Sequence, residues 1–409
     1  MHIAIIGAGA AGCFCAINLK RLHPNTKITI FEGGRKALAK VAVTGGGRCN
    51  LTNTFNQVGD IKHVYPRGDK LMKRALKRFG QDDTCKWFEK EGVKLITQED
   101  ECIFPMSQDA MQIVNTILSN IHKLGVTIQT SHKVRSIAPT TDRRYAISFT
   151  NNEIADVTAD YVVVCTGGLP SLKSFDVFSP LHLDIVSPVP SLFTLNIEGD
   201  WHQALMGTVV ENASAMIAGT NFKSNGPLLL THWGMSGPAI IKLTSYAARY
   251  LADHEYKGQL IVNWFGTKKE NEIKEEISEL ANKYPSRQIT NVYPRHLTSK
   301  HWQYLVQKSH IADTQRWGTL NNKELNRLVT TLSADTYQIT GKCPFKEEFV
   351  TCGGVALNNI NINTLEAKIH PNLFFAGEVL DVDAITGGFN LQAAWSMGYI
   401  ISQEIASRL

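Results

Sequence analysis

Six residues near the start of the chain, GAGAAG at positions 7–12, constrain the possible fold more than any other stretch. They follow an apolar run, residues 2–6, that predicts a β-strand, and they lead into residues 10–22, whose apolar pattern predicts a helix. A second predicted strand, residues 27–31, ends at Glu32, 20 residues after the last glycine of the pattern. A G-x-G-x-x-G pattern between a strand and a helix, followed by an acid at this distance, is typical of dinucleotide-binding folds.

The three glycines have distinct roles in such a fold. Gly7 permits a tight turn, Gly9 lets the backbone approach a pyrophosphate, and Gly12 lets the helix pack against the strand. The helix presents unpaired N–H groups at its start, and these groups bind phosphate oxygens. Glu32 is then expected to accept hydrogen bonds from an adenosine ribose.

The later part of the chain indicates which dinucleotide is bound. Buried strands are predicted at residues 161–165, which end in Thr-Gly-Gly at 166–168, and at 372–375, which precede a final helix at about residues 390–408. A domain that binds NAD does not need this distant return of the chain, whereas the far half of FAD must be held by residues from elsewhere. The final helix follows a glycine pair, residues 387–388, so its positive end can face a flavin ring, which gains negative charge on reduction. No second G-x-G-x-x-G follows a predicted strand, so no separate nicotinamide domain is expected.

Composition narrows the class of protein further. A chain of 409 residues with 43% hydrophobic and 19% charged residues is expected to form two or three globular domains. No apolar run approaches the roughly 20 residues of a membrane helix, and the chain begins without a basic leader or cleavage site, so we expect a cytoplasmic protein. The eight cysteines show no CxxC and no metal-type spacing, so neither a zinc nor an iron–sulfur site is expected.

The motifs together resemble the bacterial aminoacetone-oxidase-like (BaiN-like) flavoprotein family, in the superfamily with a glutathione-reductase-type FAD domain. The matching blocks are GAGAAG (7–12), Glu32, GRKALAKVAVTGGGRCNLTN (34–53), TGG (166–168), GPLLLTHWGMSGP (226–238), TCGGVALNNI (351–360) and FFAGEVLDVDAITGGFNLQAAWSMG (374–398). They span nearly the whole chain in the expected order. Phe389 is one departure, because Tyr is expected to be common there, so a phenol near the flavin is missing.

The resemblance implies an α/β protein with a discontinuous, Rossmann-like FAD-binding domain, an inserted β-rich domain and a helical insertion within that. The FAD-binding domain is expected at residues 1–188 and 346–409, the β-rich domain at 189–263 and 334–345, and the helical insertion at 264–333. The prolines near residue 188 disfavour a continuous helix at the first boundary.

The resemblance also implies the activity, an FAD-dependent oxidoreductase that transfers hydride between a small organic substrate and flavin N5. Aminoacetone oxidation and the reduction of bile-acid-type enones have been assigned to some members, so both kinds of substrate remain open. NAD(P)H and oxygen are the candidate redox partners. The substrate is expected between the flavin and the inserted domain, because cofactor sites favour domain junctions.

The fingerprint and the resemblance together give the residues expected to contact FAD. They are Gly7, Gly9, Ala10, Ala11, Gly12, Glu32, Gly33, Lys36, Lys40, Thr44, Gly45, Gly46, Gly47, Arg48, Cys49, Asn50, Val134, Thr166, Gly167, Gly168, Gly377, Glu378, Asp381, Gly388, Phe389, Asn390 and Leu391. The two lysines either neutralise phosphate or are solvated. In the acidic cluster of Glu378, Asp381 and Asp383, one carboxylate is expected to bind ribityl or ribose hydroxyls.

Arg48 and His232 are the candidates for catalysis. Arg48 either clamps a phosphate or substrate carboxylate or braces nearby carbonyls. His232, between Gly and Pro turns, either transfers a proton near neutral pH or bonds backbone carbonyls to shape its loop. Cys49 is either a redox thiol or a small buried residue beside the cofactor; the second is favoured because no Cys lies in the following 35 residues.

An alternative function is that of an RNA-associated flavoprotein related to tRNA-modifying flavoenzymes. Residues 62–78 hold seven Lys or Arg and one Asp, and residues 264–330 hold eleven Lys or Arg and seven Asp or Glu. These stretches can attract phosphates, and Trp302 and Trp317 are candidates for stacking on bases. Packed amphipathic helices explain the same pattern, so a nucleic-acid partner is the less favoured expectation.

Overall fold

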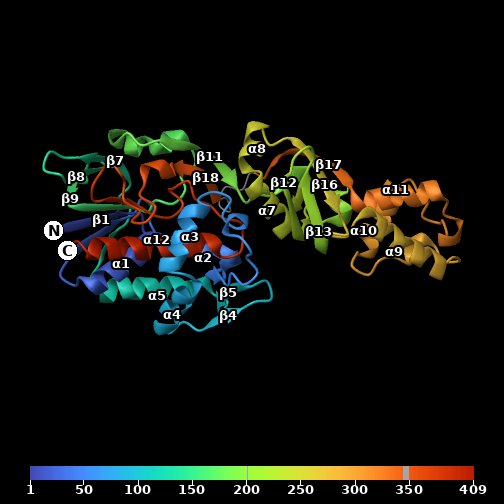
Figure 1. Ribbon diagram of the computed structural model, residues 1–409, viewed down its shortest axis with the longest axis horizontal. Helices are drawn as coiled ribbons and strands as arrows, with labels where there is room; N and C mark the ends of the chain where they lie inside the picture. The colour runs from blue at the N-terminus through green and yellow to red at the C-terminus, as the bar shows by residue number, and fades with distance from the viewer. Residues whose placement is uncertain (200, 344–349) are drawn as a thin grey trace. The chain divides into compact units, whose positions relative to one another are not determined.

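The computed structural model describes residues 1–199, 201–343 and 350–409. The chain divides into two compact units, the first formed by Met1–Val189 and Val350–Leu409 and the second by Pro190–Phe349 (Figure 1). The expected boundary at residues 345 and 346 lies outside the described residues. No helix in the described ranges is long and apolar enough to cross a membrane.

The first unit is built on a parallel sheet with the strand order β19-β10-β1-β2-β6. These strands are β1 (His2–Ile6), β2 (Lys27–Phe31), β6 (Thr127–Gln129), β10 (Tyr161–Val164) and β19 (Leu373–Phe375). The strands are rich in Ile, Val and Phe, and the three central ones are almost wholly buried, as expected for a parallel sheet covered on both faces. The α/β class and the discontinuous Rossmann-like domain are therefore confirmed.

Helix α1 (Ala10–Leu22) packs directly against α12 (Phe389–Ala406), the last helix of the chain (Figure 1). A Cβ on Gly398 would lie 2.6 Å from the carbonyl oxygen of Ala11, so the two helices touch through backbone. This contact brings the start of the fingerprint helix and the end of the chain together.

The remaining elements of the first unit surround this sheet. They are α2 (Ala39–Gly47), β3 (Thr52–Asn53), η1 (Ile61–His63), α3 (Asp69–Arg78), α4 (Gln81–Lys90), β4 (Leu95–Thr97), β5 (Cys102–Pro105), α5 (Ala110–Lys123), β7 (Val134–Pro139), β8 (Tyr145–Phe149), β9 (Val157–Ala159), η2 (Leu172–Leu181), β11 (Ile185–Ser191), β18 (Val350–Val355) and η5 (Leu357–Asn359). Strands β11 and β18 form a two-stranded sheet where the chain leaves and re-enters this unit.

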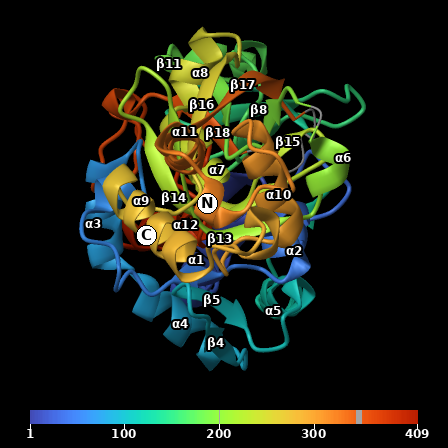
Figure 2. The same ribbon diagram turned by 90° about the vertical axis from the view of Figure 1, so that its right-hand side faces the viewer.

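The second unit combines a closed β-barrel with a group of helices. The barrel has the order β12-β15-β14-β13-β16-β17. Its strands are β12 (Leu195–Ile197), β13 (Val209–Ile217), β14 (Lys223–Leu230), β15 (Gly234–Ser236), β16 (Gly258–Asn263) and β17 (Asp335–Lys342). The helices are α6 (His202–Leu205), α7 (Pro238–Tyr246), α8 (Ala248–Asp253), α9 (Glu270–Lys283), η3 (Ile289–Asn291), α10 (Ser299–Lys308), η4 (Trp317–Thr319) and α11 (Asn322–Ser333). Figure 2 shows α9, α10 and α11 grouped together, and all three lie within the range expected for the helical insertion.

Two tryptophans that were candidates for stacking on RNA bases are core residues of this insertion. Trp302 and Trp317 are buried, and their rings lie 6.2 Å apart. The indole N–H of Trp302 donates to the carbonyl of Ile289 (2.8 Å), and that of Trp317 to the carbonyl of Val292 (3.1 Å). The expectation that they are available for stacking is therefore wrong. Their residue type suggested stacking on bases, but burial depends on tertiary packing, which the sequence alone does not show.

Candidate cofactor site

Glu32 holds the fingerprint loop in place. Its Oε2 accepts a hydrogen bond from the amide of Ala8 (2.8 Å), and its Oε1 accepts one from the amide of Gly34 (2.6 Å). A carboxylate has about four acceptor positions, so two bonds leave capacity for further donors such as ribose hydroxyls. The spacing singled out this acid but did not indicate that it braces the loop.

The loop leaves backbone facing open space where a ligand is expected. Gly9 caps α1, and a Cβ built on it would meet no atom within 4 Å. The first amide bonded within the helix is that of Cys13, to the carbonyl of Gly9, so the three preceding amides have no partner inside the helix. By contrast, a Cβ on Gly12 would lie 2.2 Å from the carbonyl oxygen of Gly7. The loop therefore fits a dinucleotide: one glycine makes room for a ligand and the other for packing.

The Thr44–Asn50 stretch also has open space beside part of its backbone. The backbone of α2 departs from helical geometry at Thr44, and Gly46 and Gly47 have φ of +68° and +81°, where an added Cβ would meet no atom within 4 Å. Cys49 is buried, and burial raises the pKa of its thiol to about 12. A protonated, buried thiol is a poor nucleophile, so the geometry supports the small-residue alternative for Cys49.

The end of this stretch is attached to the first turns of α12. In the side-chain orientation that satisfies both neighbours, the amide of Asn50 donates to the carbonyl of Thr52 (3.0 Å) and accepts from the amide of Gly388 (3.2 Å). The indole of Trp395 donates to the carbonyl of Leu51 (3.1 Å). The glycine-rich motif and the helix at the end of the chain are thus joined by direct hydrogen bonds.

Arg48 braces its own loop in this structure. Its Nε donates to the carbonyl of Gly45 (3.1 Å), and its guanidinium lies over the ring of Phe104, 4.6 Å from the centroid. The side chain is otherwise exposed, so it keeps donors for a ligand. The bracing alternative has a direct observation, and a catalytic role stays a prediction.

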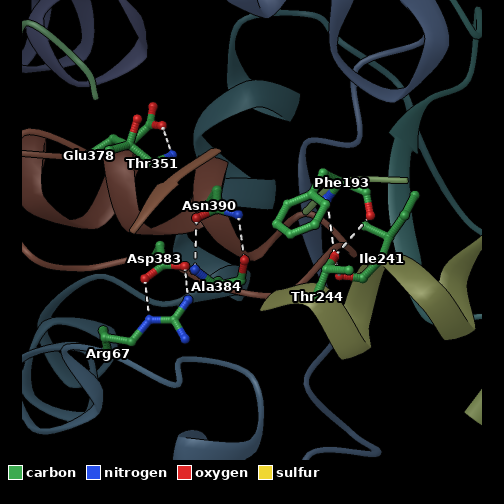
Figure 3. A network of polar contacts seen from close by, with 9 residues as sticks. All are labelled: Arg67, Phe193, Ile241, Thr244, Thr351, Glu378, Asp383, Ala384 and Asn390. Atoms are coloured by element: carbon green, nitrogen blue, oxygen red, sulfur yellow. Dashed lines mark hydrogen bonds and ion pairs between the residues drawn. The ribbon is translucent and has the colours of Figure 1, made fainter. Parts of the chain in front are cut away.

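Glu378 joins residues from distant parts of the sequence. Its Oε1 accepts from the amide of Thr351 (2.8 Å; Figure 3), and its Oε2 pairs with Nζ of Lys40 (3.2 Å). A Cβ on Gly168 would lie 2.6 Å from Oε1 of Glu378, so the Thr166–Gly168 turn lies beside it. Lys36 is exposed, as is Gly33. Lys40 is therefore paired with a carboxylate, and because its exposed ammonium group has three donors, a phosphate role for it stays a prediction.

The turn before α12 is held by side chains on both sides (Figure 3). Asp383, almost fully buried, pairs with Arg67 through both oxygens. The amide of Asn390 accepts from the N–H of Ala384 (2.9 Å) and donates to its carbonyl (3.0 Å). Asp383 and Asn390 thus support the turn, and Glu378 and Asp381 remain the half-exposed acids of the cluster.

The other predicted residues lie as follows. Val134 begins β7 and pairs with Phe149 across the small sheet of the first unit. Phe389 begins α12, with its ring 5.0 Å from that of Phe55. His232 belongs to the second unit, where it is exposed and its ring lies 3.6 Å from that of Trp233. The turn around it is closed by Thr231, whose hydroxyl bonds both the N–H and the carbonyl of Gly234.

A parallel sheet with this fingerprint loop, closed by a helix from the end of the chain, is the architecture of an FAD-dependent oxidoreductase. The chain belongs to the family described as "HI0933-like protein Rossmann domain", which matches residues 1–404. Its FAD dependence and oxidoreductase class follow from this membership together with the loop around Glu32.

Two curated relatives match almost the whole chain. The ribosomal RNA dihydrouridine synthase of Escherichia coli (strain K12) is 28% identical over 98% of this chain and 97% of that protein. The 3-dehydro-bile acid delta(4,6)-reductase of Clostridium scindens is 25% identical over 100% of this chain and 99% of that protein. The fold is similar to that of 3-ketosteroid-delta4-(5alpha)-dehydrogenase from Rhodococcus jostii RHA1, with a TM-score of 0.52, 13% identity and coverage of 99% and 96%.

Proposed function

We propose that the protein reduces a carbon–carbon double bond conjugated to a carbonyl group. The supporting observation is that two relatives aligned over almost the whole chain carry names for reactions of this kind. Dihydrouridine differs from uridine by saturation of a ring double bond conjugated to a carbonyl, and a 3-oxo-Δ4,6 steroid is a conjugated dienone. Neither relative's name describes amine oxidation, the other substrate class expected from sequence.

The open loops of the first unit are proposed to hold FAD. Glu32, fixed by the amides of Ala8 and Gly34, accepts the adenosine ribose hydroxyls. The free amides at the start of α1 bind the pyrophosphate beside Gly9. The glycines at 46 and 47 allow backbone to approach the cofactor without side chains between them. Once bound and reduced by an external donor such as NAD(P)H, the flavin would supply the hydride that saturates the double bond.

Residues of this chain are proposed to supply the remaining chemistry. Negative charge develops on the carbonyl oxygen during conjugate reduction, and a fixed guanidinium stabilises such charge. Arg48 fits that role, because Gly45 and Phe104 hold its side chain while it stays exposed. His232, whose imidazole is exposed in the second unit, is the proposed proton donor.

The test is anaerobic turnover followed by the absorbance of bound flavin. The protein is reduced chemically and mixed separately with a 3-oxo-Δ4,6 steroid, a uridine-containing RNA and buffer. We expect reoxidation of the flavin by one of the two conjugated substrates, with one equivalent of saturated product. Reduction of the oxidised flavin by aminoacetone, with no reoxidation by either conjugated substrate, would overturn the proposal. A colourless protein that takes up no added FAD would also refute the cofactor assignment.

A second candidate function is reduction of a base within RNA, and a lysine ridge on α3 favours it. Lys70, Lys73 and Lys77 are exposed and occupy one side of the helix. The neighbouring Arg74 and Arg78 instead bond to Asn363. An open groove of about 600 Å³ on the helical insertion is also basic, and it is lined by Lys308, Ser309, His310, Asn322, Lys323, Asn326, Arg327, Thr330 and Thr331. Cationic surfaces of this kind bind phosphate backbones.

Neutralising the lysine ridge is expected to weaken RNA binding. The triple variant Lys70→Gln, Lys73→Gln, Lys77→Gln should lower the slope of log affinity against log salt by about 2, since each phosphate contact on a single strand contributes about 0.7. Filter binding of an unstructured, single-stranded RNA between low and moderate salt measures this slope.

A matched control removes three exposed lysines elsewhere in the same unit. Lys86, Lys90 and Lys94 lie in and after α4, and their replacement by Gln gives the same change in net charge. Equal loss in both triple variants would indicate non-specific attraction. Absence of RNA retention by the parent at low salt would eliminate the RNA candidate.

A further inference from the structure

The turn that precedes α12, residues 381–388, has little regular structure of its own. It lies between β19 and α12 and contains Gly387 and Gly388, with φ of +128° and +86°. A backbone with two adjacent glycines in this region has many accessible conformations in isolation. Its position must therefore be fixed by contacts from outside the turn.

One short segment, residues 64–67, supplies several of these contacts. The carbonyl of Val64 accepts from the amide of Ile385 (3.0 Å). The buried hydroxyl of Tyr65 donates to the carbonyl of Phe389 (2.8 Å), in the first turn of α12. Arg67 and Asp383 also form an isolated antiparallel bridge through their backbones. The segment thus follows the turn along its length.

The Arg67–Asp383 ion pair is the strongest of these contacts. Nε of Arg67 donates to Oδ1 of Asp383 (2.6 Å), and a second guanidinium nitrogen donates to Oδ2 (Figure 3). The side chain of Asp383 is 0% exposed and that of Arg67 13%. Two-pronged pairs fix geometry as well as charge, and removal of one partner leaves a buried charge uncompensated.

The other side of the turn is closed by Asn390, which bonds both the N–H and the carbonyl of Ala384. Asp383 and Ala384 are consecutive, so the segment at 64–67 and the first turn of α12 form hydrogen bonds with adjacent residues of the turn. A displacement of Asp383 would be transmitted to the glycine pair and to the free amides at the start of the helix. These amides are the groups expected to face the flavin ring.

We propose that Arg67 is a positioning residue for FAD, acting through Asp383 on the backbone at Gly387–Gly388. The inference rests on the proposed placement of FAD in this unit. It assigns a cofactor-related role to a residue outside every glycine-rich motif. Arg67 and Asp383 need not touch the cofactor: their pair sets where the turn and the start of α12 lie.

The test compares Asp383→Asn and Arg67→Lys with a matched pair in the same unit. Arg408 and Glu366 also form a two-pronged pair, at 2.7 and 2.8 Å, between the end of the chain and the segment before β19. Glu366→Gln therefore controls for the loss of such a pair away from the turn. Each apo-protein is titrated with FAD by flavin fluorescence, the midpoint potential of the bound flavin is measured, and circular dichroism reports folding.

Asp383→Asn is expected to raise the Kd for FAD about tenfold or more. Loss of the fixed helix start should weaken binding of reduced flavin more than of oxidised flavin. A tenfold difference between them lowers the midpoint potential by about 30 mV for two electrons. Arg67→Lys keeps the positive charge but loses the two-pronged hydrogen bonding of the guanidinium. Its Kd for FAD and its midpoint potential should therefore lie between those of the parent and Asp383→Asn. Glu366→Gln should match the parent in Kd and potential.

If Asp383→Asn keeps the parent's Kd for FAD and midpoint potential while its apo-protein is less stable, the Arg67–Asp383 pair has only a structural role. That result would overturn this inference but not the proposed function. Absence of FAD binding by the parent would overturn the proposed function as well. If Asp383→Asn does not fold, Arg67→Lys, which keeps the charge but loses the two-pronged contact with Asp383, decides the question. A severalfold rise in Kd then supports the inference, and an unchanged Kd contradicts it.

Discussion

Gly9→Val is expected to leave the protein folded but nearly unable to bind FAD. The residue has extended backbone geometry that valine adopts readily, and its Cβ would meet no protein atom within 4 Å. The added side chain instead occupies the space beside the free amides of α1. Loss of phosphate bonds, worth about 1.5–3 kcal/mol each, should raise the Kd for FAD by about a hundredfold or more.

The measurement is flavin titration of apo-protein alongside thermal unfolding. Gly9→Ala should be intermediate in Kd, with the melting temperature of the parent. Gly12→Ala should instead lower the melting temperature, because its Cβ would collide with the carbonyl of Gly7 and destabilise the fold. FAD binding by Gly9→Val with parental affinity would mean that the pyrophosphate does not lie at this loop.

Glu32→Ala is expected to weaken FAD binding by about 1.5–3 kcal/mol, the range for hydrogen bonds to a charged group. This corresponds to a factor of roughly ten to a hundred in Kd. The same substitution removes the acceptors for the amides of Ala8 and Gly34, so the apo-protein should also lose about 1 kcal/mol of unfolding free energy.

Glu32→Gln separates these two roles. The amide oxygen of Gln still accepts one hydrogen bond. Its NH₂ group is a donor, however, and would face one of the two backbone N–H groups that the carboxylate of Glu32 accepts from. We expect it to lie between the parent and Glu32→Ala in FAD titration, with circular dichroism as the check on folding. Parental affinity in Glu32→Ala would place the adenosine ribose elsewhere in the unit.

Local patterns predicted the start of the fold well. The expected strands at residues 2–6 and 27–31 and the helix at 10–22 agree with β1, β2 and α1, because apolar periodicity and the glycine fingerprint act over short distances. The barrel was expected only as a β-rich region. Its closure joins β12 to β17, with Leu195 opposite Lys342, and no local pattern reports a pairing over that separation.

Helix α10 falls within the expected helical insertion at residues 264–333, but its own bounds were not predicted. Its buried face contains His301 and Trp302, which are weak helix formers, and a fully buried histidine is uncommon. Burial lowers the pKa of His301 to about 3, so the ring is neutral in the core, where it packs against Trp264. The helix is nevertheless amphipathic, since its buried residues His301, Trp302, Leu305 and Val306 share one face.

The candidate site shows the same limit. The glycine motifs and Glu378 were predicted from residue type, spacing and the resemblance, and their contacts lie in the first unit. The segment at residues 64–67 was not found. Tyr65 and Arg67 act by bonding to residues more than 300 positions later, and such partners become visible only in the folded chain.

The place of β19 at the edge of the parallel sheet has a consequence for biosynthesis. This strand pairs with β10, with Leu373 opposite Val162, yet residues 190–349 are translated between the two. At about 5–20 residues per second, the ribosome spends roughly 8–30 seconds on that stretch. During this interval the nascent sheet exposes the edge of β10, and α12 does not yet exist to cover α1. The first unit must therefore wait in an incomplete state, and cofactor capture is a late event that follows release of the last sixty residues.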